Sequence, residues 1–231
     1  MFQSNKEYIN FLKEFGVHTF LRETPNKHIE TNKIKEKFEK KKDLKTLQEI
    51  NEIADLVPLI INHNNTVKNN AKKIVLYDGN LLSDLMIIGD CNDDVPFGGK
   101  SGQLLNKMLS AIKIERNNVY LTNVVPWTLA NNQSSSEKEI LNFLPFLQRQ
   151  IEIIKPKVIY LLGSTAAKAI LSTPHDLEKL RGKWHQYRTI NLDLSIPVLV
   201  SYHPAFILKS PNYKKNAWAD LQMLKKKINE Y

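Results

Sequence analysis

Short apolar runs alternate with amphipathic stretches from residue 84 to the end of the chain. The runs are nearly all apolar, as strands buried on both faces of a parallel sheet must be. Apolar positions between the runs are spaced for helices, so the pattern predicts an α/β fold. Four strands are predicted over residues 84–89, 119–122, 157–162 and 197–201. Helices are predicted over residues 101–112, 136–154, 164–171 and 213–228, the second opening with a capping box at Ser136 and Glu139.

Residues 1–80 differ from the rest of the chain, because they contain lysine runs and few glycines. Apolar residues between 34 and 57 recur mostly at intervals of three, which predicts a helix with one apolar stripe that ends at Pro58. The lysines of such a helix would lie on its solvated face. We therefore divide the chain into a lysine-rich helical extension, residues 1–74, and an α/β domain, residues 75–231.

The formal net charge of +9 and the pI near 9.4 favour a polyanionic partner. Cationic side chains that displace counterions from phosphates gain affinity without reading sequence, so nucleic acid is the first candidate and a membrane surface the second. The basic residues are mostly lysines, and asparagine and isoleucine are also abundant. A biased base composition of the gene is an alternative source of part of this charge.

Cys91 is the only cysteine of the chain. A single cysteine excludes a disulfide within the chain and any zinc or iron–sulfur site built from several of its thiolates. No apolar run reaches the roughly 18 residues that a membrane span requires, and the first residues lack the apolar centre of a signal peptide. We therefore expect a cytoplasmic protein without membrane contacts.

Candidate site residues follow the predicted strands: Asp90, Asn123, Gly163 and His203. In open parallel sheets ligands bind beyond the carboxyl ends of the strands, so these residues are the first to consider. Asp90, Asn123 and His203 each have a structural alternative, because aspartate and asparagine are common in turns and most histidines have no catalytic role. The GGKSG string after Asp90 is not a phosphate-binding P-loop, since Asp94 stands where that motif needs its first glycine.

Three further features suit a nucleic-acid ligand. Phe97, in VPFGG, offers a flat face for a base, or else anchors its loop. Arg181 lies in LRGKWHQY, and the AFILKSPNYKK segment after His203 has apolar residues followed by basic ones. An apolar wedge fills the gap that a base leaves when it rotates out of a duplex. The alternative is that residues 206–208 pack the last helix.

These segments together resemble the uracil-DNA glycosylase superfamily, most closely its family 4, over roughly residues 75–231. The family's GEAPG and PFVGxAGxLL correspond to residues 89–92 and 96–105, and its YxTNVVK to residues 120–126. Its PKxIxxLGxTAA, LRGxW, HPAYLL and AWxDLxxLK correspond to residues 156–167, 180–184, 203–208 and 217–225. The resemblance implies a three-layer α/β/α fold around a central four-stranded parallel sheet.

Three departures from family 4 change the expectations. Members of that family usually hold a [4Fe–4S] cluster on four cysteines, but Trp127 and Phe143 stand at two of these positions and residues 54–60 offer no cysteine pair. We therefore expect no cofactor and apolar packing in the cluster's place. Asp90 replaces the glutamate of the first motif in a shorter loop, and Gly98 replaces a valine, which loosens the loop around Phe97.

The resemblance implies a monofunctional glycosylase of base-excision repair that flips uracil out of DNA and hydrolyses its N-glycosidic bond. Phe97 would stack on uracil and Asn123 would read its edge, with Gly89 and Cys91 also in contact with the base. His203 would hydrogen-bond the uracil O2 as negative charge develops there. Asp90 would orient the attacking water or offset the positive sugar. No metal is required.

The resemblance further implies DNA contacts from nine residues: Lys100, Ser101, Gly163, Ser164, Arg181, Pro204, Ile207, Leu208 and Lys209. The partner would be DNA containing uracil, and the chain would act as a monomer without an obligatory protein partner. Two other functions stay open. One is a glycosylase for another deaminated base, and the other is a DNA-binding relative weakened in catalysis by the changes at Asp90 and its loop.

Overall fold

The computed structural model describes residues 47–63, 71–90, 95–129 and 135–231, which leaves Cys91 and the helices expected before residue 47 outside the described residues. The chain divides into two compact units, Met1–His63 and Asn64–Tyr231. In the first unit the 3-10 helix η1 (Ile53–Asp55) leads into α3 (Leu56–Asn62). The prediction that a helix ends at Pro58 is wrong. Pro58 lies in the first turn of α3, where the amide hydrogen that proline lacks would have no helical partner.

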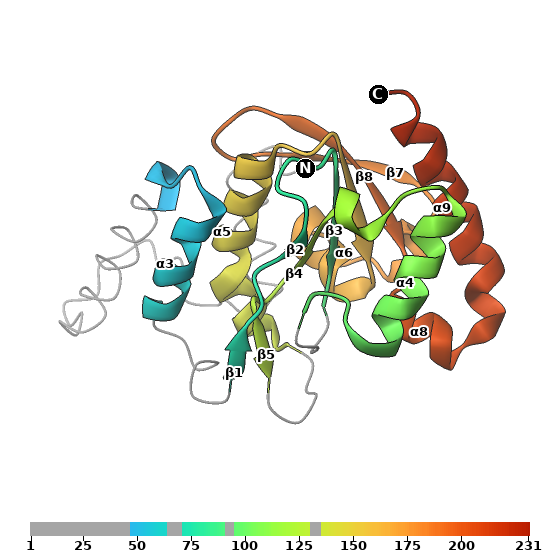
Figure 1. Ribbon diagram of the computed structural model, residues 1–231, viewed down its shortest axis with the longest axis horizontal. Coiled ribbons are helices and arrows are strands. Elements are labelled where there is room, and N and C mark those ends of the chain that lie inside the picture. The colour runs from blue at the N-terminus through green and yellow to red at the C-terminus, as the bar shows by residue number, and fades with distance from the viewer. Residues whose placement is uncertain (1–46, 64–70, 91–94, 130–134) are drawn as a thin grey trace, which may run out of the picture. The chain divides into compact units, whose positions relative to one another are not determined.

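A six-stranded sheet with the order β2-β4-β3-β6-β8-β7 forms the centre of the second unit (Figure 1). Its four inner strands are parallel: β4 (Tyr120–Asn123), β3 (Leu85–Gly89), β6 (Val158–Leu162) and β8 (Ser195–Ser201). They confirm the four predicted strands, with small shifts at their ends. Residues of β3, β4 and β6 are all buried, which explains why these strands read as uninterrupted apolar runs.

Two edge strands run antiparallel to their neighbours and were not predicted. β2 (Asp78–Gly79) pairs with β4, and β7 (Trp184–Arg188) pairs with β8. In β7 only Tyr187 is buried, so this strand has no apolar run to reveal it. A separate two-stranded antiparallel sheet joins β1 (Ala71–Ile74) to β5 (Trp127–Leu129).

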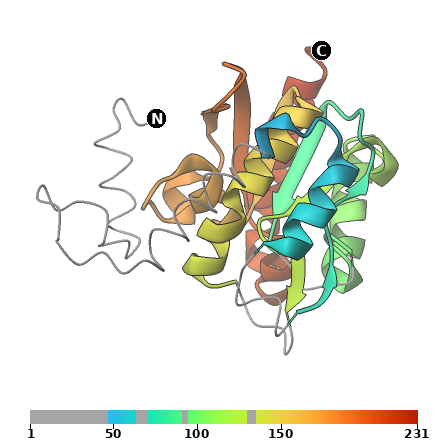
Figure 2. The same ribbon diagram turned by 90° about the vertical axis from the view of Figure 1, so that its left-hand side faces the viewer.

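Helices cover both faces of the large sheet (Figures 1 and 2). On one face, α4 (Gly99–Ala111) and α9 (Lys214–Ile228) bury leucines against alternate residues of the strands. On the other face lies α5 (Glu137–Ile154), whose Gln150 Oε1 accepts a hydrogen bond of 2.8 Å from Tyr120 Oη of β4. Next to α5 lies α6 (Ser164–Leu171). The predicted three-layer α/β/α fold is confirmed.

Short helices complete the second unit: α7 (Leu177–Leu180), α8 (Pro204–Lys209), η3 (Arg116–Asn118) and η5 (Pro211–Tyr213). The predicted capping box at the start of α5 is confirmed, because Ser136 Oγ accepts from Glu139 N at 3.3 Å while Ser136 N donates to Glu139 Oε2 at 2.6 Å. Among the described helices, none is both long and apolar enough to cross a membrane.

Candidate active site

The carboxyl ends of the parallel strands bring the predicted residues into one row. Gly89 and Asn123 are register partners at the ends of β3 and β4, and Val124 N donates to Gly89 O at 2.9 Å. Gly163 N, directly after β6, donates to the Ser201 carbonyl at the end of β8 at 2.9 Å. His203 follows two residues later. The predicted convergence of strand ends at one edge of the sheet is therefore present.

The ring of Phe97 joins this row from the loop between β3 and α4. It stacks on the His203 imidazole with ring centroids 5.4 Å apart and an interplanar angle of 19°. A Cβ atom at Gly89 would lie 2.3 Å from Phe97 Cζ, so only glycine allows the ring to approach the end of β3 so closely. The ring is only 1% exposed. Phe97 thus contacts both His203 and Gly89, and Gly89 is the register partner of Asn123.

His203 has a fixed orientation and a defined proton position. It caps the N-terminus of α8, and its Nδ1 accepts a hydrogen bond of 3.2 Å from Ala205 N. Burial lowers the pKa of the imidazole to about 4, so the ring is neutral at neutral pH. Because Nδ1 is the acceptor, Nε2 carries the proton. This Nε2 is buried and has no hydrogen-bond partner within the described part of the chain.

The carboxyl group of Asp90, directly after β3, lies among hydroxyl groups. Ser135 Oγ donates to Asp90 Oδ1 at 3.0 Å, and the Thr165 hydroxyl in the first turn of α6 also donates to this carboxyl. Burial raises the pKa of Asp90 above its ordinary value, and the two hydroxyls oppose this shift. A partly desolvated carboxylate with a raised pKa is a better proton acceptor than an exposed one.

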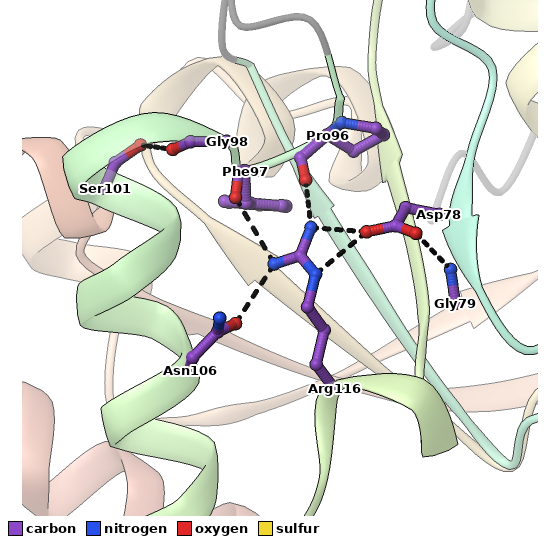
Figure 3. A network of polar contacts seen from close by, with 8 residues as sticks. All are labelled: Asp78, Gly79, Pro96, Phe97, Gly98, Ser101, Asn106 and Arg116. Atoms are coloured by element: carbon purple, nitrogen blue, oxygen red, sulfur yellow. Dashed lines mark hydrogen bonds and ion pairs between the residues drawn. The ribbon is translucent and has the colours of Figure 1, made fainter.

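Arg116 holds the backbone of the loop that carries Phe97 (Figure 3). Its Nη2 donates to Pro96 O at 2.6 Å, and its Nη1 donates to Phe97 O at 3.3 Å and to Asn106 Oδ1 at 3.1 Å. The guanidinium is in turn fixed by Asp78 Oδ2, 2.8 Å from Nε and 2.6 Å from Nη2. Phe97 has a φ of +53°, a conformation that costs free energy in a non-glycine residue. The two hydrogen bonds from the guanidinium to Pro96 O and Phe97 O offset part of this cost.

We expect Arg116→Lys to loosen the Phe97 loop, since an ammonium group cannot reproduce the planar fork. The unfolding free energy should fall by about 1–3 kcal/mol, as measured by urea denaturation. Arg188→Lys, in the edge strand β7, is the matched control and should leave stability within about 0.5 kcal/mol of the wild type. Equal stability of the two variants would show that the guanidinium does not hold the loop.

The residues predicted to contact DNA fall into two groups. Lys100, Ser164, Leu208 and Lys209 are exposed, and Gly163 is half-buried beside His203. Ser101, Pro204 and Ile207 are buried, and Ile207 packs in a core cluster with Tyr202 and Ala217, which matches the packing alternative.

Arg181 is engaged within the protein. It pairs with the buried Asp220, with Nη2 2.5 Å from Oδ1, and its Nη2 also donates to Asn216 O at 3.1 Å. The part that Arg181 plays in DNA binding stays a prediction, whereas its role within the protein is the ion pair with Asp220.

Among the residues predicted to contact the base or to cleave the bond, only Cys91 lies outside the described residues.

Sequence reasoning missed Arg116 with Asp78, and the hydroxyls of Ser135 and Thr165 around Asp90. One signal could have found the first pair: arginines are few in this lysine-rich chain, so each is a candidate for a contact that lysine cannot make. Gly102 is a second signal, because a Cβ there would lie 1.8 Å from the Phe97 carbonyl oxygen. Both signals point to the loop after β3 as a built part of the site.

Comparison with known proteins identifies the class that this fold and site define. The sequence model of the uracil DNA glycosylase superfamily matches residues 76–222 of this chain. The chain belongs to this superfamily, whose members hydrolyse N-glycosyl bonds.

Several individual relatives of this chain are uracil-DNA glycosylases of type 4. A type-4 uracil-DNA glycosylase of Pyrobaculum aerophilum is 31% identical over 191 residues, which cover 78% of this chain and 92% of that protein. Type-4 uracil-DNA glycosylases of Sulfurisphaera tokodaii and Saccharolobus solfataricus are 35% and 32% identical, over 64% and 68% of this chain and 71% and 77% of theirs. The similarity to the family 4 type predicted from the motifs is confirmed.

The residues present do not fit a [4Fe–4S] cluster, which needs four cysteine ligands. The chain has one cysteine. Phe143, at one of the expected ligand positions, is fully buried, and its ring centroid lies 6.1 Å from that of Phe146. Trp127 stands at another of these positions, and its Nε1 is buried without a hydrogen-bond partner among the described residues. Aromatic packing and an indole occupy these two positions, neither of which supplies a thiolate.

We therefore expect activity and stability to be independent of iron. Purified protein should contain iron only at background level by elemental analysis, and a strong iron chelator should leave the Tm unchanged. Stoichiometric iron that survives size-exclusion chromatography would contradict this expectation.

Proposed function

We propose that this chain is a uracil-DNA glycosylase, which flips uracil out of DNA and hydrolyses the bond between uracil N1 and the deoxyribose C1′. The observation that carries the proposal is the neutral His203, with a buried Nε2–H beside Phe97 and in the same row of strand ends as Asn123. A neutral donor suits an anionic leaving group, since it stabilises developing charge without first forming a tight ion pair with a competing anion.

Each group has a role in the proposed reaction. Phe97 stacks on the flipped base, and Asn123 presents a donor and an acceptor to the imide edge of uracil. Both side chains are 1% exposed in the structure, so the proposed binding step includes a rearrangement that uncovers them. The N1–C1′ bond breaks with its electron pair moving to uracil, and the His203 Nε2–H donates to O2, where negative charge gathers. The sugar becomes oxocarbenium-like, and the Asp90 carboxylate faces this positive charge. Asp90 then accepts a proton from the water that adds to C1′.

DNA would approach the same edge of the sheet. The exposed residues Lys100, Ser164, Leu208 and Lys209 are proposed to contact the backbone and the gap left by the flipped base. Ser164 opens α6, so its backbone amide belongs to the first turn, where amides are free to bind a phosphate. Lysine contacts predict binding that weakens as salt rises from roughly 50 to 200 mM.

The test of the proposal is a panel of oligonucleotides that differ in one base. Protein prepared without added metal should yield alkali-labile sites in the strand with uracil, and none in matched strands with cytosine or thymine. Cleavage at hypoxanthine but not at uracil would favour the glycosylase for another deaminated base. Salt-dependent duplex binding without any base release would favour the binding protein.

The pH dependence of kcat/KM separates the two ionisable groups of the proposed site. Burial raises the pKa of Asp90. As pH falls, the active carboxylate form should therefore be lost at a pH above about 3.9, the ordinary pKa of an aspartate side chain. The His203 imidazole stays neutral until pH approaches about 4, so no step should appear near 6.5, where an ordinary histidine titrates. The measurement is uracil release between pH 4.5 and 8.5. A step near 6.5 that is absent in His203→Asn would contradict this assignment.

A further inference from the structure

A stack of side chains runs from the interior to the surface beside His203. The Arg181 guanidinium carbon lies 5.1 Å from the centroid of the Tyr202 ring. Tyr202 in turn stacks on Phe206 of α8, with centroids 5.3 Å apart and an interplanar angle of 26°. Tyr202 is 1% exposed, whereas Phe206 is 39% exposed. The stack therefore ends in an aromatic ring at the surface.

The inner members of the stack are held rigidly. Arg181 is fixed by Asp220, and the Tyr202 hydroxyl donates to Glu178 Oε1 at 2.7 Å. Tyr213 supports the outer end, with its ring centroid 5.0 Å from both Tyr202 and Phe206, and is itself 37% exposed. A ring that is already ordered loses little conformational entropy when a ligand stacks on it.

Three exposed lysines flank the aromatic residues of the stack in the sequence: Lys209 at the end of α8, and Lys214 and Lys215 at the start of α9, directly after Tyr213. Within the described residues, none of the three forms an ion pair with a carboxylate. Exposed aromatic rings flanked by unpaired cations match the chemistry of a nucleic-acid strand, which has stacking bases and a phosphate backbone.

We propose that Phe206, Tyr213 and the three lysines form a surface that binds single-stranded DNA, with a base stacked on Phe206 as the next layer of the Arg181–Tyr202–Phe206 stack. The inference rests on the proposed function for its location: Phe206 lies three residues after His203, at the edge of the candidate active site. A single strand is favoured over a duplex, because both faces of a paired base inside a duplex are already covered by neighbouring bases.

The experiment measures binding of the full chain to a fluorescent thymidine decamer, which contains no uracil, by fluorescence anisotropy. Phe206→Leu keeps an apolar side chain but removes the ring, so its Kd should rise about 5- to 100-fold, the range that one base–ring stack provides. The Kd for a duplex of the same length should change by less than about 3-fold, the effect of a neutral surface substitution. Tyr213→Leu should act in the same direction.

Tyr77→Leu is the matched control, because Tyr77 is 38% exposed and also stacks on a buried tyrosine, Tyr120, with centroids 5.3 Å apart. This variant should bind the decamer like the wild type. Unchanged binding by both Phe206→Leu and Tyr213→Leu would overturn the proposal, and so would an equal loss for single strand and duplex. Since the decamer has no uracil, a protein without glycosylase activity can still pass this test, and an active enzyme can fail it.

A second measurement tests the lysines and the stacking separately. Changing Lys214 and Lys215 to glutamine should reduce the slope of log K against log salt by about 0.7 for each phosphate that the protein no longer neutralises. Phe206→Leu should lower affinity and leave this slope unchanged, and it should abolish the quenching of a 2-aminopurine base in the decamer. An unchanged slope in the lysine variant, or unchanged quenching in Phe206→Leu, would overturn the corresponding part of the proposal.

Discussion

Replacing His203 with alanine is expected to lower kcat for uracil release about 10²- to 10³-fold, the loss measured when one donor to a developing anion is removed from an enzyme. KM should change little, because the Nε2–H bond to O2 strengthens only as charge develops. The measurement is single-turnover cleavage of a uracil-containing oligonucleotide over a range of protein concentrations, which separates the maximal rate from the half-saturation concentration. His203 also caps α8, so the Tm of the variant must be measured beside its activity.

His175→Ala provides the control for this substitution, since His175 is exposed and lies in the connection between α6 and α7, outside the row of strand ends. Its kcat should equal that of the wild type. A His203→Ala protein that folds and turns over at the wild-type rate would remove His203 from the mechanism. Loss of activity together with a large fall in Tm would instead assign the histidine a structural role as the cap of α8.

Asn123→Asp should lower kcat/KM for uracil on the order of 10²-fold or more, an effect at least as large as that of His203→Ala. The side chain is 1% exposed, so a carboxylate there is buried, and it would place a negative charge against the uracil oxygen to which the amide donates. The substitution replaces only the amide nitrogen. The measurement is kcat/KM on the uracil oligonucleotide, together with the Tm.

Asn118→Asp makes the same chemical change just before β4, at an exposed position. It should leave kcat/KM unaltered. Full activity of Asn123→Asp on uracil would exclude Asn123 as the group that reads the base edge. A loss confined to Asn123→Asp would support that role.

The sequence was sufficient to predict the four inner strands and the start of α5. Burial on both faces requires a run of apolar residues, and a capping box requires serine and glutamate at a fixed spacing. The apolar pattern was insufficient at the edges of the sheet. Strand β7 exposes most of its residues, and β2 has only two. Edge strands are stabilised mainly by pairing with a neighbour, which an isolated sequence window does not reveal.

For the candidate site, the same topology rule placed Asn123, Gly163 and His203 correctly at one edge of the sheet. The contact between Phe97 and His203 depends on the conformation of a loop, and that conformation is set by Arg116, a residue beyond the next helix. Such contacts arise from tertiary packing between distant segments. No periodicity in the sequence records them, so they could not be predicted from local patterns.

The paired Asp220 and Arg181 tie the last helix to the strand that leads to His203. Besides Arg181, Asp220 Oδ2 accepts a hydrogen bond of 2.6 Å from Ser201 Oγ, at the end of β8. A chain cut before α9 would leave Arg181 as a cation without its counter-ion and Ser201 without its acceptor, next to the histidine. Expression designs should therefore retain α9.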